Sequence, residues 1–509
     1  MKTSNNQVLI FIFISVVVIR CICVATMGLT PQDAYYYYYS EQMELSYFDH
    51  PPMIAWFLKL FSFVFGKEVW VIKMADLIIT LLTLYAFYYL SGMFLSKSKN
   101  AKALLLLGST FMITILSISS APDVPLMLFW TISLIFLCKA IFEGRLVYWV
   151  LSGFSIGFAF DSKYTAVFLL MGLGVFLVFS KQYRRFIFSK YTLLLLMSFC
   201  IAILPVVIWN VQHDFVSFKF QTGHRAEAFS LRNLTALNFI GTVGHQLLLL
   251  LPIFLISLFI VFWKLIRRVV KTGVMMDDRK LFLVSFSVPL LLFFFSVSLI
   301  DWVKINWMMP AYISGAILLA AFLPRKFLKA QLLVSMFLHI VLLVQIVLYP
   351  VPVKSDDTWW GWDKLNSEVL DIRAEYPGYF IFSNDGYKTT AILNFYDQEV
   401  YAGNIVGENA LQFSIRDTNL TDLVGRNAIF IDSEPRFENE FKGNSVPPKL
   451  MKYFSSVEEI APIILKNNAH KALRKFRMYK CENYRAQEQV LGKSYSLHIM
   501  QPMLNKGAW

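Results

Sequence analysis

The sequence carries little charge for its length. Only 16% of the 509 residues are Asp, Glu, Lys or Arg, whereas 57% are hydrophobic. Soluble globular domains usually carry about 25% charged residues. The composition therefore excludes an ordinary soluble protein and predicts a polytopic membrane protein.

Signatures of several common protein classes are also missing. The five cysteines lie mostly inside apolar runs and form no CxxC pair, so we expect neither a disulfide framework nor a cysteine metal site. The chain has no Gly-rich loop of the Walker or dinucleotide type. It also has no evident internal repeat, which argues against a transporter built from two related halves.

The formal net charge of +13 does not indicate a nucleic-acid partner. The basic residues fall in short clusters between apolar runs, as expected of loops that orient a membrane protein. We interpret the apolar runs as eleven membrane spans. The loops that hold most of the Lys and Arg residues alternate with the others and are predicted to be cytoplasmic. The predicted spans are residues 7–29, 71–95, 102–119, 125–142, 147–161, 165–180, 191–209, 240–263, 281–300, 308–323 and 329–349.

Two details of the first spans have structural interpretations. Residues 23–25 resemble a signal-peptide cleavage site, so removal of residues 1–25 stays an alternative to a retained first span. Asp76 is the one acid that this assignment places inside the membrane, and pairing with Arg20 would compensate its buried charge.

Residues 350–509 differ in character from the rest of the chain. Their mixed polar and apolar segments predict a small α/β domain, with a strand and a helix in residues 379–397 and strands at 427–434 and 495–503. Eleven spans from a cytoplasmic N-terminus place this domain on the outer side. The predicted fold class is an all-α polytopic membrane domain, residues 1–349, followed by an extracytoplasmic α/β domain, residues 350–509.

The most informative segment is Thr30 to Gly66, which interrupts the apolar runs. It holds two acids at turn signals, Asp33 and Asp49, with five consecutive tyrosines between them. His50 precedes two prolines that forbid a continuous helix. The apolar stretch after the prolines is too short to span a bilayer and suits a helix lying in its surface. Two interpretations fit these residues, a catalytic outer loop and an ordinary aromatic belt.

Polar residues also gather in the other predicted outer loops. Asp123 lies between prolines, where it serves either as a helix N-cap or in catalysis. Lys163 either reaches solvent beside Asp161, which neutralises it, or binds an anion. His224 and Arg225 lie in a long loop and are either surface residues or ligands. Further candidates are Tyr164, Lys304 and Asn306.

The gathering of cations, acids and histidine on one face favours a functional site. Arginine binds a phosphate as a fork and lysine binds it as a point charge. Asp33 has the chemistry to take a proton from an acceptor hydroxyl as a general base. Because no nucleotide-binding loop is present and the site adjoins apolar helices, the expected phosphate belongs to a lipid-linked donor. The candidate phosphate ligands are Lys163, His224, Arg225 and Lys304.

Seven stretches of the chain resemble the membrane-embedded glycosyltransferases of the type C fold (GT-C), which use polyprenyl-phosphate sugars. The similarity is greatest to the bacterial branch related to protein O-mannosyltransferases and to the lipid A aminoarabinose transferase. The order and spacing of the stretches, from residue 33 to about residue 396, make the assignment specific. They are QDAYYYYYS, SYFDHPPMIAW, APDVPL, DSKYTAVFLL, LPVVIWNVQHDFVSFKFQTGHR, KINWMMPAY and DGYKTTAILNFY.

The resemblance implies an inverting transfer in which Asp33 deprotonates the acceptor while cations hold the departing lipid phosphate. Gln32 stands where the family has the first acid of a pair, so Asp33 is the only carboxylate at this motif. Asp49 and His50 match a family position that contacts donor phosphate or a metal, although the residue types differ. The remaining matches are of two kinds. Lys163, Tyr164, His224 and Arg225 match positions that bind the donor phosphate, and Asn306 and Trp307 match positions that line the cavity.

The predicted function is transfer of a sugar from a polyprenyl-phosphate donor to lipid A, lipopolysaccharide or another envelope glycolipid at the outer face of a bacterial inner membrane. One alternative is transfer to hydroxyl groups of exported proteins, and another, of a different class, is transport of a lipid-linked sugar. The expected partners are the lipid-linked donor, a glycolipid or protein acceptor and membrane lipids, but no nucleic acid. The sequence requires no cofactor and is compatible with a divalent metal.

Overall fold

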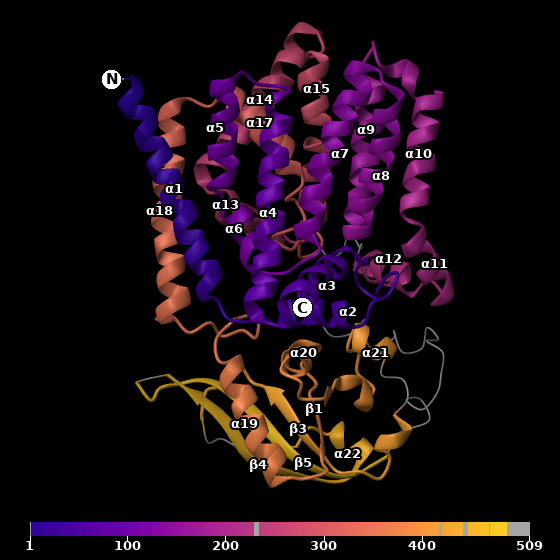
Figure 1. Cartoon of the computed structure of the whole chain (residues 1–509), viewed down its shortest axis with the longest axis vertical. Coiled ribbons are helices and arrows are strands. Elements are labelled where there is room, and N and C mark those ends of the chain that lie inside the picture. The colour runs from indigo at the N-terminus through magenta and orange to yellow at the C-terminus, as the bar shows by residue number, and fades with distance from the viewer. Residues whose placement is uncertain (1, 229–233, 417–419, 441–445, 468, 486–509) are drawn as a thin grey trace. The chain divides into compact units, whose positions relative to one another are not determined.

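The computed structural model describes residues 2–228, 234–416, 420–440, 446–467 and 469–485 (Figure 1). The chain divides into two compact units. The helical unit comprises Met1–Thr26, His50–Trp209 and Thr222–Val347, and the mixed unit comprises Met27–Asp49, Asn210–Gln221 and Leu348–Trp509. The predicted combination of a helical membrane domain with a small sheet-containing domain is confirmed. The predicted boundary at residue 349 stays a prediction.

The helices of the helical unit follow the apolar runs of the sequence. Five stretches are long and apolar enough to cross a membrane by length and composition: α1 (Lys2–Thr26), α4 (Val69–Gly92), α7 (Asp123–Glu143), α15 with α16 (Asp278–Ser285, Val288–Val297) and α18 (Arg325–Leu348). Three helix pairs are bent: α5 and α6 (Lys97–Gly108, Phe111–Ile118), α10 and α11 (Lys190–Ala202, Leu204–Gln212), and α13 and α14 (Ala236–Leu250, Pro252–Thr272). The shorter apolar helices are α3 (Met53–Phe65), α8 (Leu146–Ser162), α9 (Val167–Phe179) and α17 (Ala311–Phe322).

Bends and short helices together explain why fewer candidate spans are found than the eleven predicted: three predicted spans fall on bent pairs, and three fall on α8, α9 and α17, which are short. Each predicted run falls on one of these helices or bent pairs, yet five, or up to eight if each bent pair is one span, qualify among the described residues. The pairs bend by 58°, 50° and 110°, and prolines at positions 205 and 252 lie at two of the breaks. Proline lacks an N–H and clashes with the preceding turn, so it interrupts a helix. The count of eleven crossings and the outer location of residues 350–509 stay predictions.

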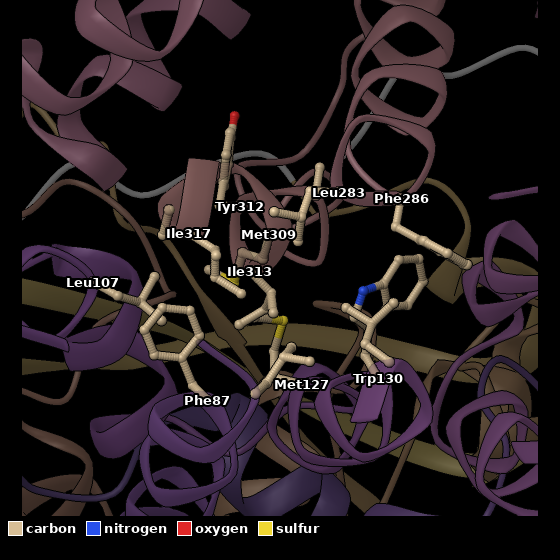
Figure 2. Close-up of a cluster of buried hydrophobic side chains, with 14 of the residues drawn as sticks. Phe87, Leu107, Met127, Trp130, Leu283, Phe286, Met309, Tyr312, Ile313 and Ile317 are labelled. Atoms are coloured by element: carbon tan, nitrogen blue, oxygen red, sulfur yellow. The ribbon is translucent and has the colours of Figure 1, made fainter. Parts of the chain in front are cut away.

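Helix α17 lies in the core of the helical unit. Residues 311–320 are all buried, as expected of a helix that is apolar on every side. Figure 2 shows side chains of α4 and α7, such as Phe87 and Trp130, packed in one cluster with Ile313 of α17. Because lipid tails are as apolar as these side chains, close packing rather than exclusion of water holds such helices together.

Small residues let α8 and α10 approach closely. Gly153 and Gly157 lie one turn apart on α8, and a Cβ atom at these positions would overlap the Leu195 carbonyl oxygen and the Ala202 side chain of α10. This spacing is the pattern of small residues that membrane helix pairs use. The contact positions the end of α8, where Lys163 follows as the C-cap residue.

Arg20 of α1 satisfies the break between α5 and α6. Its Nη2 donates to the Gly108 carbonyl at 2.7 Å and its Nε donates to the Thr114 hydroxyl at 3.0 Å. A helix break frees carbonyl groups that need donors when no water is near. The predicted pairing of Arg20 with Asp76 is therefore wrong, and Asp76 accepts a hydrogen bond from the Ser120 hydroxyl at 2.6 Å.

The mixed unit is built on a five-stranded sheet of order β2-β1-β3-β5-β4. The strands are β1 (Phe380–Phe382), β2 (Val400–Tyr401), β3 (Ala428–Ser433), β4 (Phe454–Lys466) and β5 (Ala472–Tyr484). β1 pairs in parallel with β2 and β3, and β5 pairs antiparallel with β3 and β4. The helices of this unit are α2 (Pro31–Glu41), α19 (Trp362–Glu375), α20 (Lys388–Phe395), α21 (Gln412–Arg416) and α22 (Leu450–Tyr453), while α12 (Val216–Ala228) crosses the boundary between the units.

Three elements predicted for this unit are confirmed. β1 and α20 occupy the predicted strand and helix in residues 379–397, and β3 occupies the predicted strand at 427–434. The predicted strand at 495–503 lies outside the described residues. The β4–β5 hairpin was not predicted, because charged residues interrupt the apolar residues of both strands. Those of β4 are exposed, whereas β5 buries Arg474 and Lys475.

Candidate functional site

A buried ion pair marks one end of the helical unit. Lys163, directly after α8, places its Nζ 2.9 Å from both carboxylate oxygens of Asp123 at the start of α7. Both side chains are buried. Asn306, in the loop between α16 and α17, donates its side-chain amide to the same carboxylate at 2.6 Å. Three predicted site residues from three predicted outer loops therefore meet, and we name them the Asp123 cluster.

The contacts of the Asp123 cluster test two structural interpretations, the N-cap role of Asp123 and the neutralisation of Lys163 by Asp161. Pro122 is the N-cap residue of α7, and the Asp123 side chain makes no capping hydrogen bond, so the N-cap interpretation is wrong. Asp161 does not neutralise Lys163, and its buried carboxylate oxygens have no hydrogen-bond partner among the described residues. A lysine ammonium has three N–H donors. Within the described part of the chain two of them engage Asp123, which leaves one for an anionic ligand.

Further polar contacts lie at the same end of the helical unit. Lys73 of α4 is buried and donates to the Ile118 carbonyl at the end of α6, at 2.6 Å. Asp76 follows one turn later on α4 and binds Ser120, three residues before Asp123. Asp76 was considered from the sequence, but Lys73 was not among the predicted residues. The signal was available, since two ionisable residues one turn apart on an apolar helix are rare without a role.

Three other predicted residues of the helical unit have different local settings. Tyr164 begins a 3-10 turn, and its ring centroid lies 5.2 Å from that of Phe160. Lys304 is exposed in the loop that carries Asn306. His50 is half-buried shortly before α3. Their contacts with a donor stay predictions.

The predicted roles of two residues fall outside the described part of the structure. His224 and Arg225 belong to α12, but their side chains are not described. Among the described residues, no group of three or more His, Cys, Asp or Glu side chains is placed to hold a metal ion. The phosphate contacts of His224 and Arg225 and the use of a divalent metal therefore stay predictions.

The tyrosine run of the mixed unit forms helix α2, which begins with a capping box. The Thr30 hydroxyl accepts a hydrogen bond from the Asp33 N–H at 3.2 Å, and the Asp33 carboxylate accepts one from the Thr30 N–H at 2.9 Å. Such a reciprocal pair satisfies two N–H groups that the helix leaves unbonded. Asp33 is fully buried. The predicted base is thus held in place at a helix N-terminus.

Asp49 is the acceptor for two tyrosine hydroxyls of α2. Tyr35 donates at 2.8 Å, and Tyr39, one turn later, donates to the same carboxylate oxygen. Burial and the charge of Asp49 raise the pKa of both phenols well above the ordinary range. Both tyrosines are therefore neutral donors, and Asp49 ties the chain after α2 back onto the helix.

The tyrosines of α2 pack against aromatic residues far along the chain within the mixed unit. The ring centroid of Tyr35 lies 4.4 Å from that of Tyr387, and Tyr38 stacks on Phe413 at 4.4 Å. The Gln412 N–H donates to the Tyr35 hydroxyl at 3.1 Å. Gln412 begins α21 and was not among the predicted site residues, because a single glutamine carries no sequence pattern. The packing makes α2 part of the mixed unit's core.

The fold and the polar helix ends resemble those of one class of protein, the membrane-embedded glycosyltransferases of the type C fold. The structure of ArnT from Cupriavidus metallidurans in the apo state matches with a TM-score of 0.61, 96% of this chain and 100% of that chain being covered at 11% identity. The structure of the same protein bound to undecaprenyl phosphate matches with a TM-score of 0.58, at 12% identity over 96% of this chain and 99% of that chain. The predicted resemblance is confirmed, and the chain is a multi-pass membrane protein.

Sequence comparisons agree with this class. Residues 49–209 match the family described as dolichyl-phosphate-mannose-protein mannosyltransferase. The chain is also 25% identical over 311 residues to the lipid A galacturonosyltransferase RgtD of Rhizobium johnstonii. This match covers 58% of the chain and 61% of the relative's own length.

Proposed function

We propose that the protein is a membrane glycosyltransferase that moves a sugar from a polyprenyl-phosphate donor to lipid A, lipopolysaccharide or another envelope glycolipid. The observation that carries the proposal is the buried pair of Lys163 and Asp123 in a chain with the type C fold along almost its whole length. The similarity to a lipid A galacturonosyltransferase supports the acceptor class. The match to a structure bound to undecaprenyl phosphate supports the class of carrier lipid. The proposed location is the outer face of a bacterial inner membrane.

Lys163 is the proposed ligand for the departing lipid phosphate. Asp123 holds the ammonium by both carboxylate oxygens, and Asn306 holds Asp123 in turn. The positive charge is therefore oriented before the donor binds, and a preorganised charge stabilises developing negative charge without further rearrangement. The remaining proposed phosphate and cavity contacts are Tyr164, His224, Arg225 and Lys304.

Asp33 is the proposed general base. Its carboxylate takes the proton of the acceptor hydroxyl while the hydroxyl oxygen bonds to the anomeric carbon of the sugar. The bond between that carbon and the phosphate oxygen breaks, and the electron pair leaves with the polyprenyl phosphate. Attack from the side opposite the leaving phosphate inverts the anomeric centre. Asp49 orients α2 through Tyr35 and Tyr39, and we propose that His50 contacts donor phosphate or a metal.

A protein hydroxyl is the second proposed acceptor. The match of residues 49–209 to a protein mannosyltransferase family favours it. Both acceptors offer a hydroxyl group, so the same base and the same phosphate ligand serve either reaction. Mass spectrometry of the host's envelope glycolipids and exported proteins, with and without the gene, separates the two, because the missing sugar identifies the acceptor.

Replacing Asp33 with asparagine tests the base. Asparagine keeps an oxygen that accepts the Thr30 N–H bond, so the variant should fold and retain α2. Loss of a general base costs about 10²- to 10⁴-fold in rate, and we expect a loss of that size in transfer by the protein reconstituted with a polyprenyl-phosphate sugar and lipid A.

The matched control is Glu41→Gln, an acid-to-amide change at the exposed far end of α2, which should leave turnover unchanged. Near-normal turnover by folded Asp33→Asn protein would remove Asp33 from the mechanism. Movement of the donor across the membrane without release of polyprenyl phosphate would instead identify a transporter.

A further inference from the structure

An apolar groove runs along the outside of the helical unit. It has a cavity volume of about 380 Å³ and is lined by residues of α1, α4, α5 and α6. On α4 the lining residues include Leu77, Leu81, Leu84 and Tyr88, whose spacing forms one continuous stripe along the helix, with Thr80 and Tyr85 beside it. Tyr88 lies eleven positions after Leu77, so the stripe is about 16 Å long at 1.5 Å per residue, which is about half of the hydrocarbon thickness of a bilayer.

The groove is open toward the lipid side of the helices. Leu81, Tyr85 and Tyr88 are exposed, and α1 contributes Phe13 and Val17 from the facing wall. In a membrane such a surface is covered by hydrocarbon. The dimensions match one extended acyl chain that occupies a single leaflet.

Cations gather at the end of the groove where α4 leads into α5. Leu104 of α5 lines the groove, and Lys97 lies seven residues earlier, so the two share one face of the helix. Lys97 and Lys99 are exposed, and neither forms an ion pair with a described residue. Arg325 lies close enough for its charge to act on Lys102, two residues before Leu104. The end of the groove therefore carries a local excess of positive charge.

We propose that this groove binds an anionic phospholipid of the phosphatidylglycerol class. One acyl chain lies along the α4 stripe against α1, and the phosphate lies at Lys97. Positive loops orient membrane proteins in any case. An apolar groove that ends beneath such a loop can hold the acyl chain of a lipid whose phosphate contacts the loop. Basic pockets between membrane helices bind anionic head groups in this way. The cationic end of the groove, at Lys97, lies beyond the end of α4 that is remote from Asp76, and Asp76 binds Ser120 near the Asp123 cluster.

The test measures lipid bound to the full-length protein. Protein is equilibrated with mixed micelles of phosphatidylglycerol and phosphatidylcholine with identical acyl chains, and the retained lipids are counted by native mass spectrometry. Wild-type protein should retain phosphatidylglycerol in preference to phosphatidylcholine. A basic residue at a membrane surface contributes about fivefold in affinity for anionic lipid, so Lys97→Gln should reduce the preference about fivefold. The control Lys190→Gln removes the exposed first residue of α10 and should leave the preference unchanged.

A second pair of variants tests the chain site. Val17→Trp places an indole in the groove and should lower retention of both lipids, whereas Val18→Trp adds the same bulk on the exposed neighbouring position of α1, outside the groove lining. Equal retention of both lipids by wild-type protein means adventitious lipid only and overturns the proposal. Unchanged retention in folded Val17→Trp protein also overturns it. If that variant fails to fold, the comparison of Lys97→Gln with Lys190→Gln still decides the outcome.

Discussion

Replacing Asp123 with asparagine removes the counter-charge of a lysine that the helical unit buries. In the structure both N–O distances of the pair are 2.9 Å, and the side chains are 8% and 2% exposed. Breaking a buried pair by removing one partner costs about 3–5 kcal/mol, because a charge stays buried without compensation. Asparagine preserves the shape of the site and can accept one hydrogen bond from Lys163, so we expect a loss near 3 kcal/mol in the free energy of unfolding.

A double-mutant cycle separates this effect from general damage to the site. Lys163→Met should also be destabilising, because it leaves the Asp123 carboxylate buried with the Asn306 amide as its remaining partner within the Asp123 cluster. The variant with both changes buries no charge, so its loss should be smaller than the sum of the single losses by about 2–3 kcal/mol. Denaturant titration of the purified protein in mild detergent measures each value. The exposed Lys59→Met change on α3 should stay within about 0.5 kcal/mol of wild type.

The cycle also distinguishes a structural lysine from a phosphate ligand. The double variant recovers stability but has no cation at position 163, so it should remain inactive and bind the donor weakly. Additive losses in stability would refute the buried charge pair. Recovered transfer activity in the double variant would refute the proposed contact between Lys163 and the donor phosphate.

Two predictions concern the mixed unit. Burial raises the pKa of Asp432 to about 7, although Arg477 donates to its carboxylate at 3.0 Å and opposes the rise. Because an aspartate in an unfolded chain titrates near pH 4, the folded form keeps a proton that the unfolded form releases between these values. Stability should therefore fall as the pH rises from about 4 to about 7, and Asp432→Asn should flatten this fall in melting curves recorded across that range; an unchanged slope would contradict the assignment. Tyr39→Phe removes a hydroxyl donor to the buried Asp49 carboxylate, to which Tyr35 still donates. We therefore expect the free energy of unfolding to fall by about 1.5 kcal/mol, the lower end of the range for hydrogen bonds to charged groups. Denaturant titration measures this cost, and the exposed Tyr85→Phe change should have no effect larger than about 0.5 kcal/mol.

Local chemistry made α2 predictable from sequence. Pro31 at the first helical turn and Thr30 before it are standard start signals for a helix, and they depend on adjacent residues alone. The same holds for β1, α20 and β3, whose apolar patterns lie within single short segments. The bends of α5–α6 and α13–α14 were missed because apolar runs on either side of a break read as one continuous span.

Composition and hydropathy by themselves determined that this is a membrane protein, since a chain with 57% hydrophobic residues needs an apolar surrounding. The spacing of motifs also determined the class of fold and which loops carry the candidate residues. The partners of those residues were decided by the tertiary structure. Lys163 has an acid two residues away in sequence, yet it pairs with Asp123, forty residues distant. The helix geometry sets this choice, because packing of α8 against its neighbours brings its end to the start of α7, and no local pattern records which helix ends will meet.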